Sequence, residues 1–209
     1  MPWKTKPAPV TLELPQGRAR LVPYDHRHIP QLLEALGDGT LFRWMPVPPP
    51  TTHELMRAFM EKALDAQARG EEVVFTIIDR STGRAVGSTR YLDIRHADMG
   101  LEIGWTWLSL SAQRTSINTE CKLLLLRHAF EVLGAIRVQL KTDARNEKSR
   151  AAIGRIGARF EGILRRQRVL HDQHVRDTVY YSVITEEWGF VRDRLESMLN
   201  SPRPAVSLQ

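Results

Sequence analysis

A strand, a helix and a second strand follow one another between residues 101 and 142, and this succession constrains the fold more than any other feature of the sequence. Side chains alternate in LEIGWTWL (101–108), so one face of that strand is expected to carry Leu101, Ile103, Trp105 and Trp107. A helix is expected over residues 118–133, followed by the strand AIRVQLKT (135–142). Such a crossover is right-handed and joins parallel neighbours. The sequence therefore predicts a sheet that contains a parallel pair.

The remaining segments add antiparallel strands and helices to this unit. Period-two patterns predict strands, and helical spacing with start and stop signals predicts helices. The expected strands cover residues 11–22 (with a turn at 15–17), 72–79, 84–94, 163–170 and 175–184, and the expected helices cover residues 31–36, 51–70, 146–158 and 186–199. The expected fold class is α/β, with a mixed, mostly antiparallel twisted sheet of six to seven strands and flanking helices.

The helix at 51–70 has the most detailed local prediction. Thr51 and Glu54 have the spacing of a capping box, in which each side chain satisfies a free N–H of the first turn. Side chains recur at helical spacing at Leu55, Phe59, Lys62 or Ala63, and Ala66, and these positions are expected to face the core.

Length and composition favour one domain. With 209 residues, 42% of them hydrophobic and 26% charged, the chain is long enough to bury a sizeable core. No repeat or linker divides it, so residues 11–200 are expected to form a single domain. Residues 1–10 contain three prolines and are expected to be a flexible arm, and residues 201–209 a frayed tail.

Several kinds of protein are disfavoured by what the sequence lacks. No apolar run approaches the roughly 20 residues of a membrane-spanning helix, so no membrane association is expected. The first residues lack the pattern of a signal peptide, and the single cysteine, Cys121, suits a reducing compartment, so a cytoplasmic location is expected. None of the seven histidines has the spacing of a metal site, so no metal is expected, and His128 and Cys121 are expected in the core.

The net charge of +6 raises the question of an anionic partner. Basic residues are not gathered into a tail or a stripe, and their densest group, RRQR at 165–168, is expected to be a solvated strand face. No nucleic-acid partner is therefore expected. A modest positive field also attracts a small anionic ligand.

The loop AQRTSINTE (112–120) connects the strand at 101–108 to the central helix. The first N–H groups of a helix have no partner within it, and the positive end of the helix dipole lies beside them. This loop is therefore a candidate phosphate site. Asn118 is also a common helix-capping residue, which is compatible with that role, whereas Glu120 places a negative charge nearby.

Three stretches resemble the GNAT N-acetyltransferase superfamily, and within it the branch of ribosomal-protein N-terminal acetyltransferases. They are AQRTSINTECKLLLLRHAFE (112–131), KTDARNEKSRAAIGRIGARFEGILR (141–165) and RDTVYYSVI (176–184). The resemblance covers residues 11 to about 190. It implies the GNAT fold, a mixed sheet with flanking helices, and acetyl-coenzyme A (acetyl-CoA) as the co-substrate.

The resemblance implies which residues bind acetyl-CoA. The family's loop follows Q/R-x-x-G-x-G/A, and its backbone N–H groups bind the pyrophosphate. Gln113 matches the first position, whereas Ser116 and Asn118 stand where glycines are usual, so Asn118 is expected to supply the positive φ that glycine tolerates. Asn146 is implied on the pantetheine arm, with helix capping as the alternative. The implied pyrophosphate site comprises Gln113, Arg114, Thr115, Ser116, Ile117, Asn118 and Thr119.

The resemblance also implies the catalytic residues. Glu102 matches the glutamate of the family's E-I-G-W/Y strand and is the expected general base; the alternative is a carboxylate paired with an arginine such as Arg90. Many members have, seven residues after the asparagine, a tyrosine that protonates the leaving thiolate. Here that position is Ile153, so Ser149 is the expected acid, directly or through a water.

Two aromatic residues are expected at the acceptor site. Trp44 lies in FRWMPVPPP (42–50), the segment that borders the acceptor in this family, although an apolar plug against the core is an equally good interpretation. Tyr180 and Tyr181 point to opposite faces of the closing strand, so one of them is expected in the core and Tyr180 is the candidate for the acceptor site.

The expected function is transfer of acetyl from acetyl-CoA to a primary amine, on a protein N-terminus or a small molecule, by direct attack. The alternative is a non-catalytic acyl-CoA-binding sensor with the same fold, because the loop glycines and the tyrosine are missing. Pairing of two subunits through the C-terminal strands, as a homodimer, is compatible with this fold.

Overall fold

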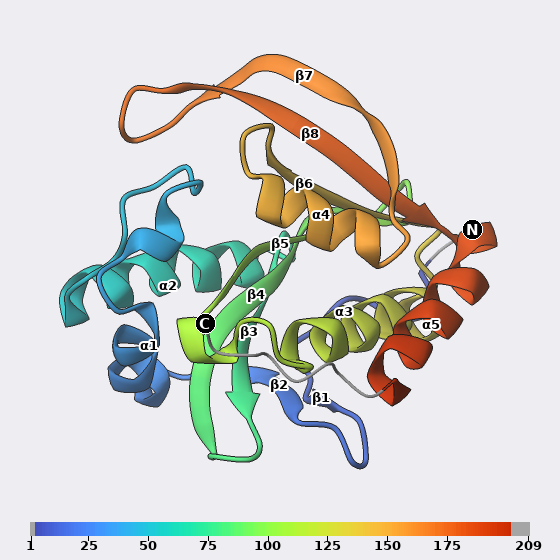
Figure 1. Ribbon diagram of the computed structural model, residues 1–209, viewed down its shortest axis with the longest axis horizontal. Helices are drawn as coiled ribbons and strands as arrows, with labels where there is room; N and C mark the ends of the chain where they lie inside the picture. The colour runs from blue at the N-terminus through green and yellow to red at the C-terminus, as the bar shows by residue number, and fades with distance from the viewer. Residues whose placement is uncertain (1–2, 202–209) are drawn as a thin grey trace.

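The computed structural model describes residues 3–201 and contains one eight-stranded sheet in the order β1-β2-β3-β4-β5-β6-β8-β7 (Figure 1). The β5–β6 pair is parallel, as the crossover predicts, and the other neighbours are antiparallel. The strands are β1 (Leu12–Glu13), β2 (Ala19–Pro23), β3 (Val73–Asp79), β4 (Arg84–Arg95), β5 (Gly100–Leu108), β6 (Arg137–Asp143), β7 (Arg159–Val169) and β8 (Val175–Ile184). The eighth strand arises because the turn predicted at 15–17 divides the first strand into β1 and β2.

Helices cover both faces of the sheet (Figure 1). One apolar core lies between the sheet and α3, α4 and α5, and a second core lies between the other face and α1 and α2. The helices are α1 (Ile29–Leu36), α2 (His53–Ala68), α3 (Ile117–Arg127), which continues as a π-helix (His128–Leu133), α4 (Glu147–Arg155) and α5 (Thr185–Asn200). His128 and Cys121 are buried in the α3 segment, as predicted.

The chain ends were predicted to be loose. Of the proposed arm, Trp3 contacts the ring of His96 and the Lys4 N–H donates to the Leu133 carbonyl at 2.9 Å. Residues 1–2 and 202–209 lie outside the described part of the chain, so the predicted tail at 201–209 is represented only by Ser201.

The alternation predicted for β5 is wrong beyond Gly104. Arg90 of β4 pairs with Gly104 and Ser88 pairs with Trp107, so β5 has one residue more than β4 across this interval. The extra residue is a β-bulge at Trp105, whose φ is 50°. A bulge transfers the following side chains to the opposite face: Leu101 and Ile103 remain in the core under α3, whereas Trp107 packs in the core under α1 and α2.

The core-facing residues predicted for α2 are partly wrong. The cap is Thr52, whose Oγ1 accepts from the Leu55 N–H at 3.2 Å, and not Thr51. The side chain of Leu55 is 52% exposed, because the buried face carries Met56, Met60, Ala63 and Ala66. Met56 and Met60 are each one residue beyond the expected Leu55 and Phe59, and they are also apolar. The sequence pattern therefore could not decide between two orientations of the helix that differ by one residue.

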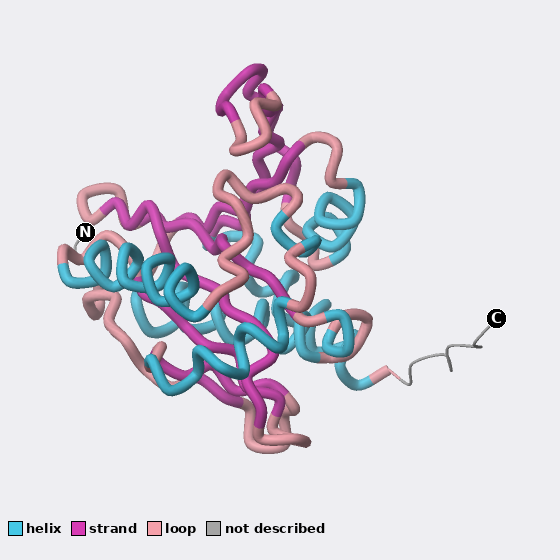
Figure 2. The backbone as a smooth tube through the Cα atoms, turned by 90° about the vertical axis from the view of Figure 1, so that its left-hand side faces the viewer, coloured by secondary structure: helices cyan, strands magenta, loops and turns pink. Residues whose placement is uncertain are grey.

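The hairpin of β7 and β8 extends beyond the body of the molecule (Figure 2). Nearly all of β7 is exposed, whereas β8 pairs with β6 along Arg137–Asp143 and is largely buried. Register shifts interrupt β7–β8 pairing between Leu164 and Arg168, and Arg166 has φ of 50°. The hairpin therefore curves over the side of the sheet on which α1 and α2 lie (Figure 1).

Gly87 marks the tightest approach between two strands of the sheet. A Cβ at this position would lie 2.1 Å from the Trp107 carbonyl oxygen, and backbone cannot move aside as a flexible side chain can. We predict that Gly87→Ala lowers the free energy of unfolding by about 2–4 kcal/mol. Gly189 in α5 has no atom within 4 Å of an added Cβ, so Gly189→Ala should raise stability by about 0.5–1 kcal/mol. Urea unfolding of both variants checks this, and equal effects would contradict it.

Candidate active site

The main cleft opens where the two parallel strands diverge. β5 and β6 are paired only at Gly100–Glu102 and Arg137–Gln139, and each then continues along one wall of a cleft of about 660 Å³. The bulge at Trp105 follows the paired residues, and a bulge bends its strand. The cleft therefore passes between strands and has one side toward α3 and α4 and another toward α1 and α2.

On the α3 side, the predicted anion loop has a different geometry from the one expected. Ser116 is helical, with φ −68°, and Asn118 lies inside α3, so neither supplies a positive φ. The positive φ, 59°, belongs to Arg114. The Thr115 hydroxyl accepts from the Ile117 N–H at 3.3 Å and donates to the Ala112 carbonyl at 2.6 Å. The expectation for Asn118 is wrong because the tight turn occurs four residues earlier.

Of the seven predicted loop residues, Gln113 and Asn118 line the cleft. The side chain of Ile117 is fully buried in the core and Thr119 is also buried, so only their backbone groups are available to a ligand. Arg114 is exposed on the rim, and Thr115 and Ser116 are half-buried. Glu120, whose charge was of concern, accepts the Ala19 N–H of β2 at 2.8 Å.

Lys148 adds a positive charge that sequence reasoning missed. Its ammonium contacts the side-chain oxygen of Gln113, and the Gln113 amide donates to the Leu108 carbonyl at 2.9 Å. Both residues line the cleft. A lysine in the first turn of α4 therefore lies against the anion loop, a proximity between distant segments that no local motif signals.

Asn146 caps α4, since its side-chain oxygen accepts the Ser149 N–H at 3.0 Å. Both residues are half-buried and line the cleft, together with the largely buried Ile153. The Asn146 side-chain oxygen therefore caps α4, as the alternative predicted. The Asn146 amide nitrogen and the Ser149 hydroxyl take no part in this cap. The structure brings these residues and Asn118 to the same side of the cleft.

Lys122 is a buried lysine in the wall of the same cleft, one helical turn beyond Asn118. Its ammonium donates to the Thr106 hydroxyl at 3.1 Å, and Thr106 in turn lies 2.8 Å from the Thr89 hydroxyl. Burial lowers the pKa of Lys122 to about 8. Within residues 3–201 it has no carboxylate partner, so its charge is desolvated without compensation. Sequence reasoning missed it because a lysine in an apolar helix is ordinarily solvated.

Glu102 lies on the opposite side of the cleft and is 2% exposed. Its Oε2 is 2.8 Å from the Lys141 ammonium and accepts from the Gln139 amide at 3.0 Å. The alternative partner Arg90 instead binds Glu72, at 3.0 Å. Gly104 has no side chain, and an added Cβ would lie 2.8 Å from Oε1 of Glu102. The absence of a side chain at Gly104 therefore keeps the space beside this oxygen free of protein atoms.

Glu72 is a second carboxylate of the cleft that the sequence did not reveal. Burial raises its pKa, and Arg90 partly offsets this effect. Arg90 is itself 4% exposed and stacks on the rings of Phe59 and Trp105 at 4.7 and 5.0 Å. Glu72 directly precedes β3, and the register of β4 and β5 pairs Leu92 with Glu102.

The two predicted acceptor-site aromatics are on this same side. Trp44 lines the cleft, half-buried, with the guanidiniums of Arg43 and Arg145 each 4.9 Å from its ring. Tyr181 is buried in the core, whereas Tyr180 lies on the Glu102 side, 5.9 Å from the Lys141 ammonium. Tyr180 does not line the cleft, but it lies beside Lys141, which does.

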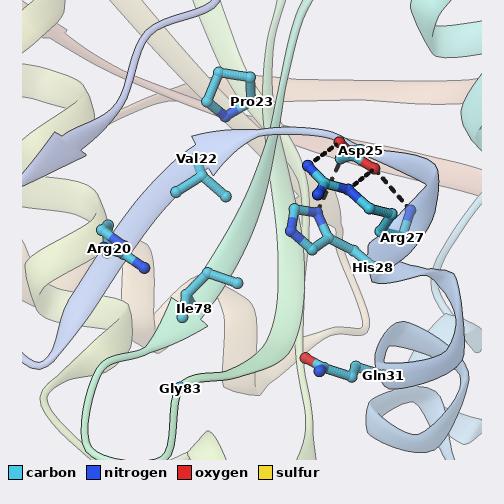
Figure 3. A pocket seen from close by; sticks show the side chains of 9 residues that line it. All are labelled: Arg20, Val22, Pro23, Asp25, Arg27, His28, Gln31, Ile78 and Gly83. Carbon is cyan, nitrogen blue, oxygen red and sulfur yellow. Dashed lines mark hydrogen bonds and ion pairs between the residues drawn. The ribbon is translucent and has the colours of Figure 1, made fainter.

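A second hollow, of about 340 Å³, lies outside α1 and shares no residue with the cleft (Figure 3). Its charged residues satisfy one another: both carboxylate oxygens of Asp25 accept from Arg27, at 2.8–3.0 Å. It is open to solvent, and its remaining arginine, Arg20, is exposed.

Residues 3–201 contain neither a candidate metal cluster nor a candidate membrane-spanning helix. No three or more histidine, cysteine or carboxylate side chains gather there in a way that could hold a metal ion. None of the helices in that range combines the length and the hydropathy needed to cross a bilayer.

Comparison with known proteins relates this chain to a family and to solved structures. The family model described as "Acetyltransferase (GNAT) domain" matches residues 18–159. The chain is 38% identical over 87 residues to the candidate ribosomal N-acetyltransferase YdaF of Bacillus subtilis, a match that spans 42% of this chain and 46% of YdaF, or about half its length. A GCN5-related N-acetyltransferase from Brucella melitensis superposes with TM-score 0.88, 28% identity and coverage of 100% and 93% of the two chains.

Mycobacterium smegmatis RimJ, solved in complex with CoA-disulfide, superposes with TM-score 0.79 at 22% identity, covering 95% of this chain and 97% of RimJ. At that identity the likeness concerns the fold. Because the family model covers more than half of the sequence, this chain belongs to the GNAT acetyltransferase family.

We predict that Lys122→Met stabilises the protein at neutral pH. The pKa of Lys122 is about 8 in the folded chain against an ordinary 10.5, so the unfolded chain binds more protons between these values. Below pH 8 the penalty applies in full and the variant should be more stable by about 2–3 kcal/mol; above pH 8 the difference should shrink. Urea unfolding at pH 7 and pH 9.5 measures both arms. A variant less stable at pH 7 would mean that the bond to Thr106 outweighs the desolvation.

Proposed function

We propose that this protein transfers the acetyl group of acetyl-CoA to a primary amine by direct attack, without an acyl-enzyme intermediate. One observation carries the proposal: the cleft between β5 and β6 has a helix start and lysines on one side of the sheet, and on the other the buried carboxylate of Glu102 and the half-buried one of Glu72. An anionic co-substrate and a cationic amine can therefore approach each other from opposite faces.

The α3 side suits coenzyme A. Free N–H groups at the start of α3, together with the Lys148 ammonium, favour a pyrophosphate there. The facing edges of β5 and β6 offer backbone donors and acceptors to the amides of a pantetheine arm, and Asn146 lies beside them. Lys122 adds a second positive charge deeper in the cleft. RimJ, which has the same fold, is described in complex with CoA-disulfide, and this supports coenzyme A as the ligand.

The other side suits the chemistry of the acceptor. Glu102 takes the proton of the incoming ammonium, and the neutral amine then attacks the thioester carbonyl to form the amide bond. A backbone N–H at the β5 bulge polarises the carbonyl oxygen. The carbon–sulfur bond breaks, and the leaving thiolate takes a proton from the Ser149 hydroxyl, which regains one from the nitrogen of the collapsing tetrahedral intermediate; Ser149 lines the α4 wall where other members have a tyrosine. Holding the two reactants together supplies most of the acceleration.

The acceptor amine belongs, in this proposal, to a protein N-terminus or to a small molecule, bordered by Trp44 and Tyr180. The relation to YdaF, described as a ribosomal N-acetyltransferase, supports the protein N-terminus. The largely buried Ile153 at the tyrosine position keeps the non-catalytic sensor as the competing function. Calorimetric titration with acetyl-CoA followed by an amine screen separates them, since a sensor binds without turnover. A homodimer stays a prediction.

We predict that Glu102→Gln lowers kcat by about 10²–10⁴ if Glu102 is the base. Glutamine retains the size of the side chain and an oxygen for Lys141 and Gln139, so acetyl-CoA affinity should remain within about twofold. Steady-state kinetics and calorimetry measure the two effects. Glu72→Gln is the matched control, with the other carboxylate of the cleft changed. A larger loss in the control than in Glu102→Gln would assign the base to Glu72.

We predict that glycine at Ser116 and Asn118 does not improve acetyl-CoA binding. Both residues are helical, so glycine relieves no strain there. It instead loosens the first turn of α3, which should cost about 1 kcal/mol of stability. Calorimetry and thermal unfolding of the double variant test this. A tighter complex in the variant would show that these side chains obstruct the pyrophosphate.

A further inference from the structure

Two arginines face each other at the end of the cleft near Trp44. Arg168 of β7 and Arg176 of β8 are register partners, and both line the cleft. Directly opposed residues of an antiparallel pair have Cβ atoms about 5 Å apart, where like charges destabilise the pairing. The sheet thus holds two positive charges side by side at a place that a ligand can reach.

Arg176 is the more constrained of the two. It is 7% exposed, one of its terminal nitrogens donates to the Trp44 carbonyl at 3.3 Å, and its Nε is buried with no hydrogen-bond partner among the described residues. Burial lowers the pKa of Arg176; the negative charge of Asp143 opposes this effect and the positive charge of Arg168 adds to it. A buried guanidinium with an unused donor is costly unless an anion completes it.

The surroundings compensate this charge only in part, through Asp143 and Glu102. Four arginines gather at this end of the cleft: Arg43 and Arg145 contact the Trp44 ring, Arg176 binds the Trp44 carbonyl, and Arg168 lies opposite Arg176. Only Arg145 has a salt-bridge carboxylate within residues 3–201. That partner, Asp143, also receives the Arg145 N–H at 2.9 Å and is 1% exposed, so its oxygens are already engaged. Glu102 is likewise held by Lys141. The acceptor side of the cleft therefore combines a carboxylate floor with an excess of positive charge at one end.

We propose, resting on the acetyltransferase function above, that the acceptor is a peptide chain with an acidic side chain close to its reacting N-terminus, and that Arg168 and Arg176 bind that carboxylate. Arginine pairs with carboxylate through two parallel, charge-assisted hydrogen bonds, which would also relieve the repulsion between the two guanidiniums.

The distance between the two ends of the site favours a peptide over a free amino acid. Lys141, which holds Glu102, is the register partner of Tyr180, and Arg176 is four residues from Tyr180 along β8. A strand rises about 3.3 Å per residue, so the backbone position of Arg176 lies roughly 13 Å along β8 from that of Tyr180, although the charges of Glu102 and Tyr180 still act on the Arg176 guanidinium. An extended peptide spans that distance with its first two to four residues, whereas the α-carboxylate of a free amino acid is too close to its own amine.

The experiment measures thiol release from acetyl-CoA with amidated tetrapeptides. Aspartate is placed at the second, third or fourth position of an alanine peptide, and each is compared with its asparagine isostere. We expect aspartate to raise kcat/KM at least tenfold at one position, chiefly through KM, as for a hydrogen bond to a charged group. Arg168→Gln, in an exposed residue, should abolish that preference, and Arg176→Lys should weaken it.

Arg165→Gln is the matched control, an exposed arginine of the same strand outside the cleft lining, and it should retain the preference. Acetyl-CoA affinity, measured by calorimetry, should be unchanged in Arg168→Gln; a loss would assign the pair to the co-substrate and overturn the inference. Equal rates for aspartate and asparagine peptides would also overturn it. So would a preference for free alanine over alaninamide without any peptide preference, which would point to the α-carboxylate. Absence of turnover with every amine would overturn the acetyltransferase proposal itself.

Discussion

The divergence of two parallel strands is the constraint on which the rest of this structure depends. β5 and β6 share only three pairs of residues, and the bulge at Trp105 follows them. A sheet interior normally leaves no backbone groups unpaired, because a buried N–H or C=O without a partner is costly. Here the separated edges face a cleft and are available to an extended ligand. The divergence thereby converts the middle of a sheet into a binding site that both faces can reach.

The two faces contribute different charged groups: lysines on the α3 side, and carboxylates together with basic side chains on the other, which agrees with transfer between an anionic donor and a cationic acceptor. Lys122 and Lys148 lie on the α3 side, whereas Glu72 and Glu102 lie across the sheet. Several of these groups are buried with few partners, so the fold accepts a cost in stability where the site needs charge. The arginines near Trp44 concern the acceptor. Their excess positive charge at one end of the cleft favours acceptors that carry a carboxylate in addition to the reacting amine.

Much of the architecture could be predicted from local pattern. The crossover between residues 101 and 142, the parallel pair that it implies, and the helices with clear start and stop residues agree with the structure. Errors arose where a pattern was ambiguous by one residue. In α2, methionines beside the expected apolar positions rotate the buried face. In β5, strict alternation was assumed through a bulge, which inserts one residue and moves Trp107 to the opposite core. In the loop, the positive φ belongs to Arg114 because the turn geometry, and not the residue type, decides it.

The sequence by itself determined the succession of elements, the fold class and the segments that carry the chemistry, because these follow from periodicity, capping and turn residues over short distances. Only the tertiary structure decided which charges meet. Lys141 rather than Arg90 holds Glu102, Lys148 lies against Gln113, Lys122 enters the cleft wall, and Arg168 faces Arg176. Those contacts join residues that are far apart in the chain or depend on strand register. Register and sheet curvature are set by the packing of both cores together, a property that no single segment contains.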